Sequence, residues 1–296
     1  MIMKRDAEAE LKKWFERDTR KPLILRGARQ VGKSTLVRNF ARDNGIKLYE
    51  INLERHLDLK NDFAVMDPER ICRAISVYTG GNPSKGDGLL FIDEIQAIPE
   101  AVAALRYFYE EMPEVPVISA GSLLEFSLSG AKFPMPVGRI EYMYLGPVTF
   151  REFVSAAAPD MLAFLDETGF GTEIPDSAHN RLNELFRTYL FTGGMPESAA
   201  EYIENRDALR SGEVLQSILD TYEDDFSKYA QNRDLALMQS VFRRIPVTAG
   251  QKTKYVNLSR EAPSRDVKAV LDLFKKAQVC SIVYASDCSG IPLYSG

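Results

Sequence analysis

Residues 27–34 have the sequence GARQVGKS, which matches the phosphate-binding pattern G-x-x-x-x-G-K-[ST]. The short apolar run at residues 23–26 before the motif is typical of a buried strand. After the motif, apolar residues recur at helical spacing until Asn44 and Gly45 end the pattern. The motif therefore lies at a turn from strand to helix, which is the setting in which it binds a nucleoside triphosphate.

The residue types at the fixed positions of this motif each suit the binding of phosphate. Gly27 and Gly32 let the backbone curl so that successive N–H groups point toward phosphate oxygens, and the positive end of the following helix strengthens this anion site. We expect Lys33 to reach the β- and γ-phosphates and the Ser34 hydroxyl to bind Mg²⁺. The predicted nucleotide-binding residues are Gly27, Ala28, Arg29, Gln30, Val31, Gly32, Lys33, Ser34 and Thr35.

A second motif, GLLFIDE at residues 88–94, is a continuous apolar run that ends in two carboxylates. Open α/β sheets bind their ligands at the carboxyl ends of such strands. We expect Asp93 to hold Mg²⁺ and Glu94 to polarise an attacking water, which favours hydrolysis over transfer to a small molecule. In isolation, adjacent carboxylates after a strand are often only solvated turn residues, and the upstream phosphate loop favours the catalytic interpretation.

Further segments complete a family pattern: VISAGS at 117–122, the Gly138–Arg139 pair, LGPVTFREF at 145–153 and GGMPE at 193–197. Together with the two motifs above, they resemble the AAA+-type P-loop ATPases of the archaeal-ATPase-like superfamily of bacteria and archaea. The match runs over most of the chain. The resemblance implies an α/β P-loop NTPase with a parallel sheet flanked by helices, followed by a small helical lid and a winged-helix domain.

The resemblance also implies a sensor strand at residues 115–122, ending in a polar residue near the γ-phosphate. Relatives usually have threonine where this chain has Ala120. Ser122 or Ser119 must then supply the hydroxyl, and an ordinary strand end with a capping serine is the alternative.

Arg139 belongs to the Gly–Arg pair that relatives keep. It is a candidate for stabilising transition-state charge on the γ-phosphate, from the same chain or from a neighbour, or else it pairs with a carboxylate. Gln96 and Arg29 are further candidates for contact with the nucleotide or a partner, although side chains at loop positions such as Arg29 and Gln30 often point to solvent.

Strands that alternate with helices predict a parallel sheet in the first half of the chain. The second half is mostly helical in pattern, and Gly193–Gly194 is expected to break a helix, either as a nucleotide-sensing corner or as a simple C-cap. The acidic stretch from Asp220 to Asp225 is interpreted as a solvated helix face. The predicted units are residues 1–155 for nucleotide binding, 156–232 for the lid and 233–296 for the winged helix.

Positive charge is concentrated near the carboxyl end. Residues 243–276 contain nine Lys and Arg against three Asp and Glu, a local charge of +6 in a chain of net charge −5. We expect a helix from an N-cap at Ser264, a strand at 281–284 and a turn through 287–290, which is the order of a winged helix. Winged helices bind DNA or mediate protein contacts, and both alternatives stay open.

Length and composition predict a protein of two or three compact units, because 296 residues exceed what one core usually organises. No apolar segment reaches the length of a signal or membrane span. The scattered set Cys72, Cys280 and Cys288 lacks a disulfide or zinc spacing, so a cytoplasmic location is expected. Relatives commonly continue with a further domain, so we expect the natural chain to extend beyond Gly296.

We therefore predict an ATPase that binds ATP and ADP and requires Mg²⁺, with Lys33, Glu94, Arg139 and Ser122 as catalytic candidates and Ser34 and Asp93 as metal ligands. A nucleotide-gated switch or adaptor with negligible turnover is the first alternative, because a switch needs the same phosphate loop. A DNA-binding regulator is the second. The expected partners are DNA at the basic segment, a protein partner or a second copy of the chain, and no membrane.

Overall fold

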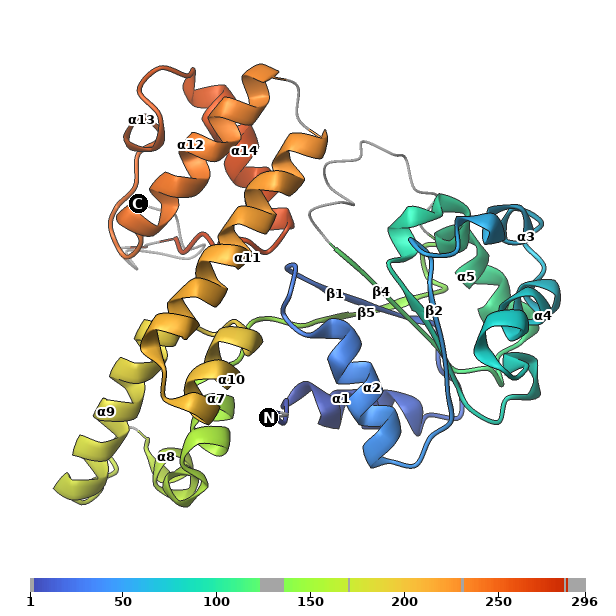
Figure 1. Cartoon of the computed structure of the whole chain (residues 1–296), viewed down its shortest axis with the longest axis horizontal. Helices are drawn as coiled ribbons and strands as arrows, with labels where there is room; N and C mark the ends of the chain where they lie inside the picture. The colour runs from blue at the N-terminus through green and yellow to red at the C-terminus, as the bar shows by residue number, and fades with distance from the viewer. Residues whose placement is uncertain (1–2, 123–135, 170, 230–231, 285, 287–296) are drawn as a thin grey trace.

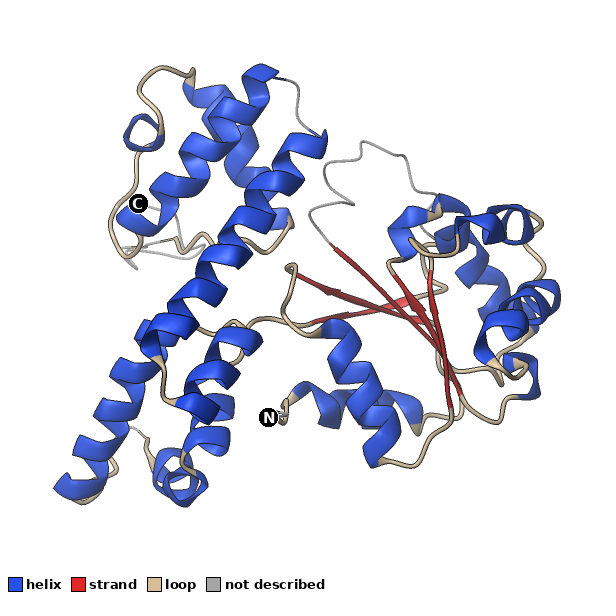
Figure 2. Cartoon of the chain, in the orientation of Figure 1, coloured by secondary structure: helices blue, strands red, loops and turns tan. Residues whose placement is uncertain are grey.

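The computed structural model describes residues 3–122, 136–169, 171–229, 232–284 and 286. An α/β unit holds the first half of the chain, and helices form the remainder (Figures 1 and 2). None of the described helices combines the length and the apolar character needed to cross a membrane.

The sheet has five parallel strands in the order β2-β3-β4-β1-β5. Strand β3 is buried at every residue, whereas β2 buries only alternate residues, because β3 lies between two strands and β2 lies at an edge of the sheet. Since all strands run the same way, the ends of β1 and β3 meet at one edge of the sheet. The strands are β1 Leu23–Gly27, β2 Leu48–Asn52, β3 Leu89–Asp93, β4 Val117–Ser122 and β5 Glu141–Tyr144.

Helices cover both faces of this sheet (Figure 1). One face packs against α1 and α2, and the other against α3, α4 and α5, so alternate residues of each central strand lie in two different cores. The helix that begins at Pro99 buries Ala101, Val102, Leu105 and Phe108 against the sheet. These helices are α1 Ala7–Phe15, α2 Lys33–Asp43, α3 Lys60–Ala64, α4 Pro68–Thr79 and α5 Pro99–Glu111, with single 3-10 turns at Leu57–Leu59, Pro83–Lys85 and Ile95–Ala97.

A group of four helices follows the sheet. Helix α7 begins with a capping box. The Thr149 hydroxyl accepts a hydrogen bond from the Glu152 backbone N–H, and the Glu152 carboxylate accepts one from the Thr149 backbone N–H. The expected break at Gly193–Gly194 is confirmed: Gly193 ends α9 with φ +67°, and a Cβ on Gly194 would lie 2.6 Å from the Val148 carbonyl oxygen. The helices are α7 Phe150–Ala157, α8 Leu162–Glu167, α9 Asp176–Thr192 and α10 Pro196–Asn205, with a 3-10 turn at Pro159–Met161.

Helix α11 runs from this group to the last helices of the chain (Figure 1). Its residues Tyr222 and Phe226 pack against Phe242 of α12, and Phe226 also packs against Phe274 of α14. This aromatic cluster is the centre of the carboxyl-terminal helical unit. The helices are α11 Ala208–Tyr229, α12 Asn232–Thr248, α13 Tyr255–Leu258 and α14 Ser264–Lys276.

The described residues do not form the expected winged helix. The expected helix is present as α14, but its N-cap is Pro263 rather than Ser264, which is its first residue. The helix buries Val267, Val270, Leu271 and Phe274. However, residues 281–284 form no strand, so that prediction was wrong, and Val283 is 92% exposed. The predicted turn at 287–290 lies outside the described residues. Over its described part, the region after the sheet is entirely helical.

Candidate nucleotide-binding site

The glycines of residues 27–34 are required for two different reasons. Gly32 has φ +89°, a left-handed conformation that glycine adopts without steric cost. Gly27 is the last residue of β1, and a Cβ there would lie 2.2 Å from the Leu145 carbonyl oxygen. Gly27 therefore allows the close approach of the segment after β5, whereas Gly32 makes the turn into α2.

Lys33 is the first residue of α2, and its side chain folds back over the loop. Its Nζ donates to the carbonyl oxygens of Ala28 at 2.9 Å and Gly27 at 3.3 Å. The ammonium thus lies inside the curve of the loop, at the amino end of a helix. This is where a lysine adds its charge to the backbone N–H groups of an anion site.

The two predicted metal ligands contact one another. The Ser34 hydroxyl donates to Asp93 Oδ2 at 2.9 Å, and Asp93 Oδ1 accepts from the Glu94 backbone N–H at 3.1 Å. Burial raises the pKa of Asp93, since desolvation disfavours its charged form. A hydroxyl and a carboxylate are hard oxygen ligands of the kind that Mg²⁺ prefers, and a cation beside Asp93 would offset the cost of burying its charge.

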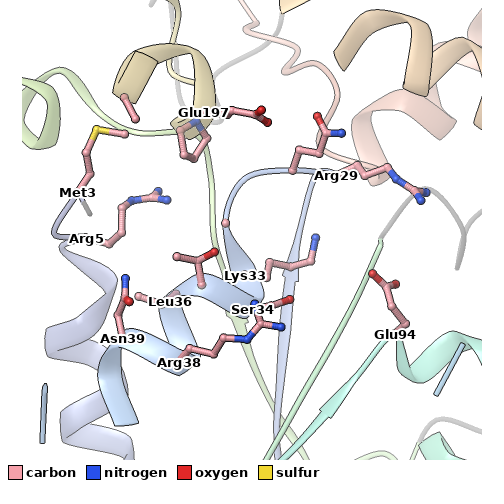
Figure 3. A pocket seen from close by; sticks show the side chains of 15 residues that line it. Met3, Arg5, Arg29, Lys33, Ser34, Leu36, Arg38, Asn39, Glu94 and Glu197 are labelled. Atoms are coloured by element: carbon pink, nitrogen blue, oxygen red, sulfur yellow. The ribbon is translucent and has the colours of Figure 1, made fainter. Parts of the chain in front are cut away.

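Glu94 follows β3 in a left-handed backbone conformation with φ +50°. For a residue with a side chain this conformation is uncommon, and it is found preferentially at functional sites. The Gln96 amide donates to Glu94 Oε2 at 2.6 Å and so fixes the direction of the carboxylate. Figure 3 shows Glu94 across the cavity from Lys33 and Ser34.

A cavity of about 550 Å³ joins these side chains, within the size range of small-molecule sites (Figure 3). One wall is the loop and α2, and the opposite wall comes from the amino-terminal segment and the start of α10. Gly193 and Gly194 thus end α9 and connect it to α10, whose first residues line the cavity. The lining residues are Met3, Arg5, Arg29, Gln30, Gly32, Lys33, Ser34, Thr35, Leu36, Arg38, Asn39, Glu94, Pro196, Glu197 and Ala200.

Arg5 is a site residue that the sequence did not reveal. Its Nε lies 3.1 Å from Glu152 Oε1, and both side chains are buried, at 8% and 4% exposure. Its other nitrogens donate to the Val31 carbonyl at 2.9 Å and the Gly146 carbonyl at 2.7 Å. Arg5 therefore ties the amino-terminal segment to the loop and to the start of α7. The T-x-x-E pattern of residues 149–152 is typical of a capping box. However, no local pattern connects Glu152 with Arg5, which lies 147 residues earlier in the sequence.

The loop also contacts α11. Arg29 Nη1 donates to Asp225 Oδ2 at 2.6 Å, and the Asp225 side chain is only 1% exposed. The Tyr222 hydroxyl donates to the Arg29 carbonyl at 3.2 Å, and burial raises the pKa of Tyr222 to about 12. The interpretation of residues 220–225 as a solvated face was therefore wrong at Asp225, because this carboxylate has a basic partner that is distant in sequence.

Arg139 and Ser119 do not line the described cavity. Arg139 Nε donates to Glu110 Oε1 at 2.7 Å, the carboxylate-pairing alternative, and its side chain is 44% exposed. Ser119 is buried, and its hydroxyl contacts the Leu23 carbonyl at 3.4 Å. The backbone of Ser122 ends β4 beside Gly27, whereas its side chain is outside the described part of the chain. Ala28 and Val31 of the loop are buried in the core. The roles of Arg139 and Ser122 in turnover stay predictions.

Three basic residues of the carboxyl-terminal unit have partners among the described residues. Arg243 pairs with Glu223 at 2.6 Å, Arg265 lies 3.3 Å from Asp266, and Arg244 donates to the Asn257 carbonyl. Binding of DNA by this unit stays a prediction. All nine basic residues of 243–276 are exposed: Arg243, Arg244, Lys252, Lys254, Arg260, Arg265, Lys268, Lys275 and Lys276.

Comparison with known proteins agrees with this geometry. Residues 19–154 match the model of a family described as an AAA domain, and residues 183–292 match a domain of unknown function (DUF8612). The fold is similar to that of a Walker-type ATPase of Pyrococcus abyssi, with a TM-score of 0.54 and 18% identity over 93% of this chain and 90% of that one. No curated protein matches the chain. Residues 19–154 are therefore an AAA domain of the P-loop ATPase class, and the helical region that follows carries a domain of unknown function.

Proposed function

We propose that this protein hydrolyses ATP to ADP and phosphate in the cavity between the loop and Glu94. The observation that carries the proposal is the Ser34–Asp93 contact at 2.9 Å, with Lys33 and Glu94 lining the same cavity. One phosphate-binding loop, two hard oxygen ligands and one carboxylate base are the parts that phosphoryl transfer to water requires.

Each residue of this set has a distinct role. The backbone N–H groups of residues 27–35 and the Lys33 ammonium hold the β- and γ-phosphates. Ser34 and Asp93 would hold Mg²⁺, which when bound would supply positive charge to the phosphate oxygens. Glu94 accepts a proton from the attacking water as the new P–O bond forms and the bond to ADP breaks. Gln96 keeps the Glu94 carboxylate directed toward that water.

Nucleotide binding is proposed to act on the helices as well. Pro196, Glu197 and Ala200 of α10 line the cavity, so a bound nucleotide touches the sheet unit and the helical group together. Arg29 connects the loop to α11, which continues into the carboxyl-terminal unit. Hydrolysis would then change the contacts of both helical parts.

The experiment is a phosphate-release assay with MgATP on the wild type and on Lys33→Ala. We expect turnover by the wild type, loss of turnover when Mg²⁺ is chelated, and loss of both turnover and nucleotide-induced thermal stabilisation in Lys33→Ala. A wild type that is neither active nor stabilised by ATP contradicts the proposal. A wild type that keeps bound ADP after purification and shows no turnover supports the switch instead.

A further inference from the structure

Arg29 is the one loop residue that the structure joins to α11 through both its side chain and its main chain, among the described residues. Its side chain is 27% exposed, its guanidinium contacts Asp225, and its carbonyl accepts from the Tyr222 hydroxyl. Arg29 also lines the cavity together with Lys33, Ser34 and Glu94. In Figure 3 the Arg29 guanidinium and the Glu94 carboxylate lie on the same side of Lys33.

We propose that Arg29 is an in-chain arginine for the terminal phosphate of ATP, and that Asp225 competes with this phosphate for the guanidinium. The inference rests on the proposed function, since it assigns a contact within the same nucleotide site. Position 29 is where the loop borders both the cavity and α11. An arginine there adds positive charge beside the phosphorus that Glu94 and its water would face.

The chemistry of the pair permits two arrangements. A guanidinium carries five N–H donors in a rigid plane and pairs with either a carboxylate or a phosphate. In one arrangement, Arg29 and the almost fully buried Asp225 neutralise each other. A γ-phosphate brings a stronger anion to the cavity side of Arg29 and draws the guanidinium away from Asp225. ADP lacks this group and leaves the pair intact.

The same contact gives the carboxyl-terminal unit a means of sensing the nucleotide. Asp225 lies on α11 between Tyr222 and Phe226, which pack against α12 and α14. Loss of this ion pair raises the cost of keeping the Asp225 charge in the core, so the packing of α11 changes when Arg29 moves. The γ-phosphate is thereby coupled to the packing of α11.

Arg139 is the alternative source of positive charge, and its contacts are different. It pairs with Glu110, which also accepts from Arg106, and it does not line the described cavity. Arg29, in contrast, lines the cavity together with Lys33 and Ser34.

The test is to titrate the protein with the non-hydrolysable analogue AMP-PNP and with ADP, both with Mg²⁺, by calorimetry. The variants are Arg29→Ala and Asp225→Asn, and the readout is the ratio of the two dissociation constants. Arg29→Ala should weaken AMP-PNP binding about tenfold or more and ADP binding less than about threefold, because it removes a charged hydrogen bond made only to the third phosphate. Asp225→Asn should shift the ratio the other way.

Glu223→Gln is the matched control, because Glu223 lies on the same helix and pairs with Arg243 of α12 rather than with the loop. It should leave the ratio unchanged. If Asp225→Asn does not fold, Arg29→Lys is the second variant, and it should show an intermediate ratio since it keeps charge but loses the planar donor set. Equal weakening of AMP-PNP and ADP in Arg29→Ala overturns the inference and leaves the proposed function intact. A wild type that binds neither nucleotide overturns both.

Discussion

The Ser34 hydroxyl donates a hydrogen bond to the Asp93 carboxylate across 2.9 Å, although 59 residues separate the two in sequence. Ser34 follows β1 and Asp93 ends β3, and one strand, β4, lies between them in the sheet. Because the strands are parallel, both residues reach the same edge, where parallel sheets bind their ligands. The arrangement places two hard oxygen ligands side by side at this edge.

A first prediction concerns the cost of this arrangement. Replacing Asp93 with Asn removes a buried negative charge but keeps an acceptor for the Ser34 hydroxyl. We expect Asp93→Asn to raise the melting temperature of the nucleotide-free protein by about 2–4 °C, equivalent to about 1 kcal/mol, while Mg²⁺-dependent turnover is lost.

Differential scanning calorimetry without Mg²⁺ or nucleotide measures this effect. The control is Asp43→Asn, which changes a half-exposed carboxylate at the end of α2 and should leave the melting temperature nearly unchanged. A lower melting temperature for Asp93→Asn than for the wild type would show that Asp93 stabilises the empty site.

The second prediction concerns the buried pair of Arg5 and Glu152. Arg5→Ala leaves Glu152 buried without its cation and removes the donors to the Val31 and Gly146 carbonyls. Breaking such a pair costs about 3–5 kcal/mol, so we expect a large fall in the denaturant midpoint and weaker nucleotide binding.

Arg17→Ala is the control for this change, because Arg17 pairs with Glu141 at an exposed position. Its effect on stability should stay below about 1 kcal/mol. Similar midpoints for Arg5→Ala and Arg17→Ala would refute the tethering role of Arg5.

The third prediction uses two glycines with opposite surroundings. An alanine at position 27 brings its Cβ to 2.2 Å from the Leu145 carbonyl oxygen, which is backbone and must be displaced. Gly212 lies within α11 with open space around it, where alanine favours the helix. Chemical denaturation should show a loss of more than about 1 kcal/mol for Gly27→Ala and a gain of roughly 0.4–1 kcal/mol for Gly212→Ala. Equal stabilities would contradict the close approach at Gly27.

The local parts of the fold and site could be predicted from the sequence. Three of these parts are the phosphate loop, the helix after it and the acidic end of β3. Each is determined by residues within about one turn or one strand of it in sequence, and such local relationships appear as motifs and as periodic apolar residues. The buried stripe of α14 and the helix end at Gly193 are of the same kind.

The remaining parts depend on contacts that no local pattern records. Arg29 meets Asp225 across 196 residues, and Arg5 meets Glu152 across 147. The predicted strand at 281–284 has β-branched and aromatic residues, yet a strand is stabilised by a partner, and the described residues provide none there. In the acidic stretch, composition predicted solvent for the whole face, but the distant Arg29 makes Asp225 a core residue.

The fourth prediction, and the most direct test of the account, is the rate of phosphate release by Glu94→Gln compared with the wild type. Because Gln keeps the size of Glu but does not accept a proton, we expect turnover to fall by about 10²–10⁴-fold with MgATP affinity within about threefold of the wild type. Glu197→Gln, a second carboxylate lining the cavity, should retain most of the activity. Turnover by Glu94→Gln at the rate of the wild type would contradict the assignment of Glu94 and the hydrolytic site built around it.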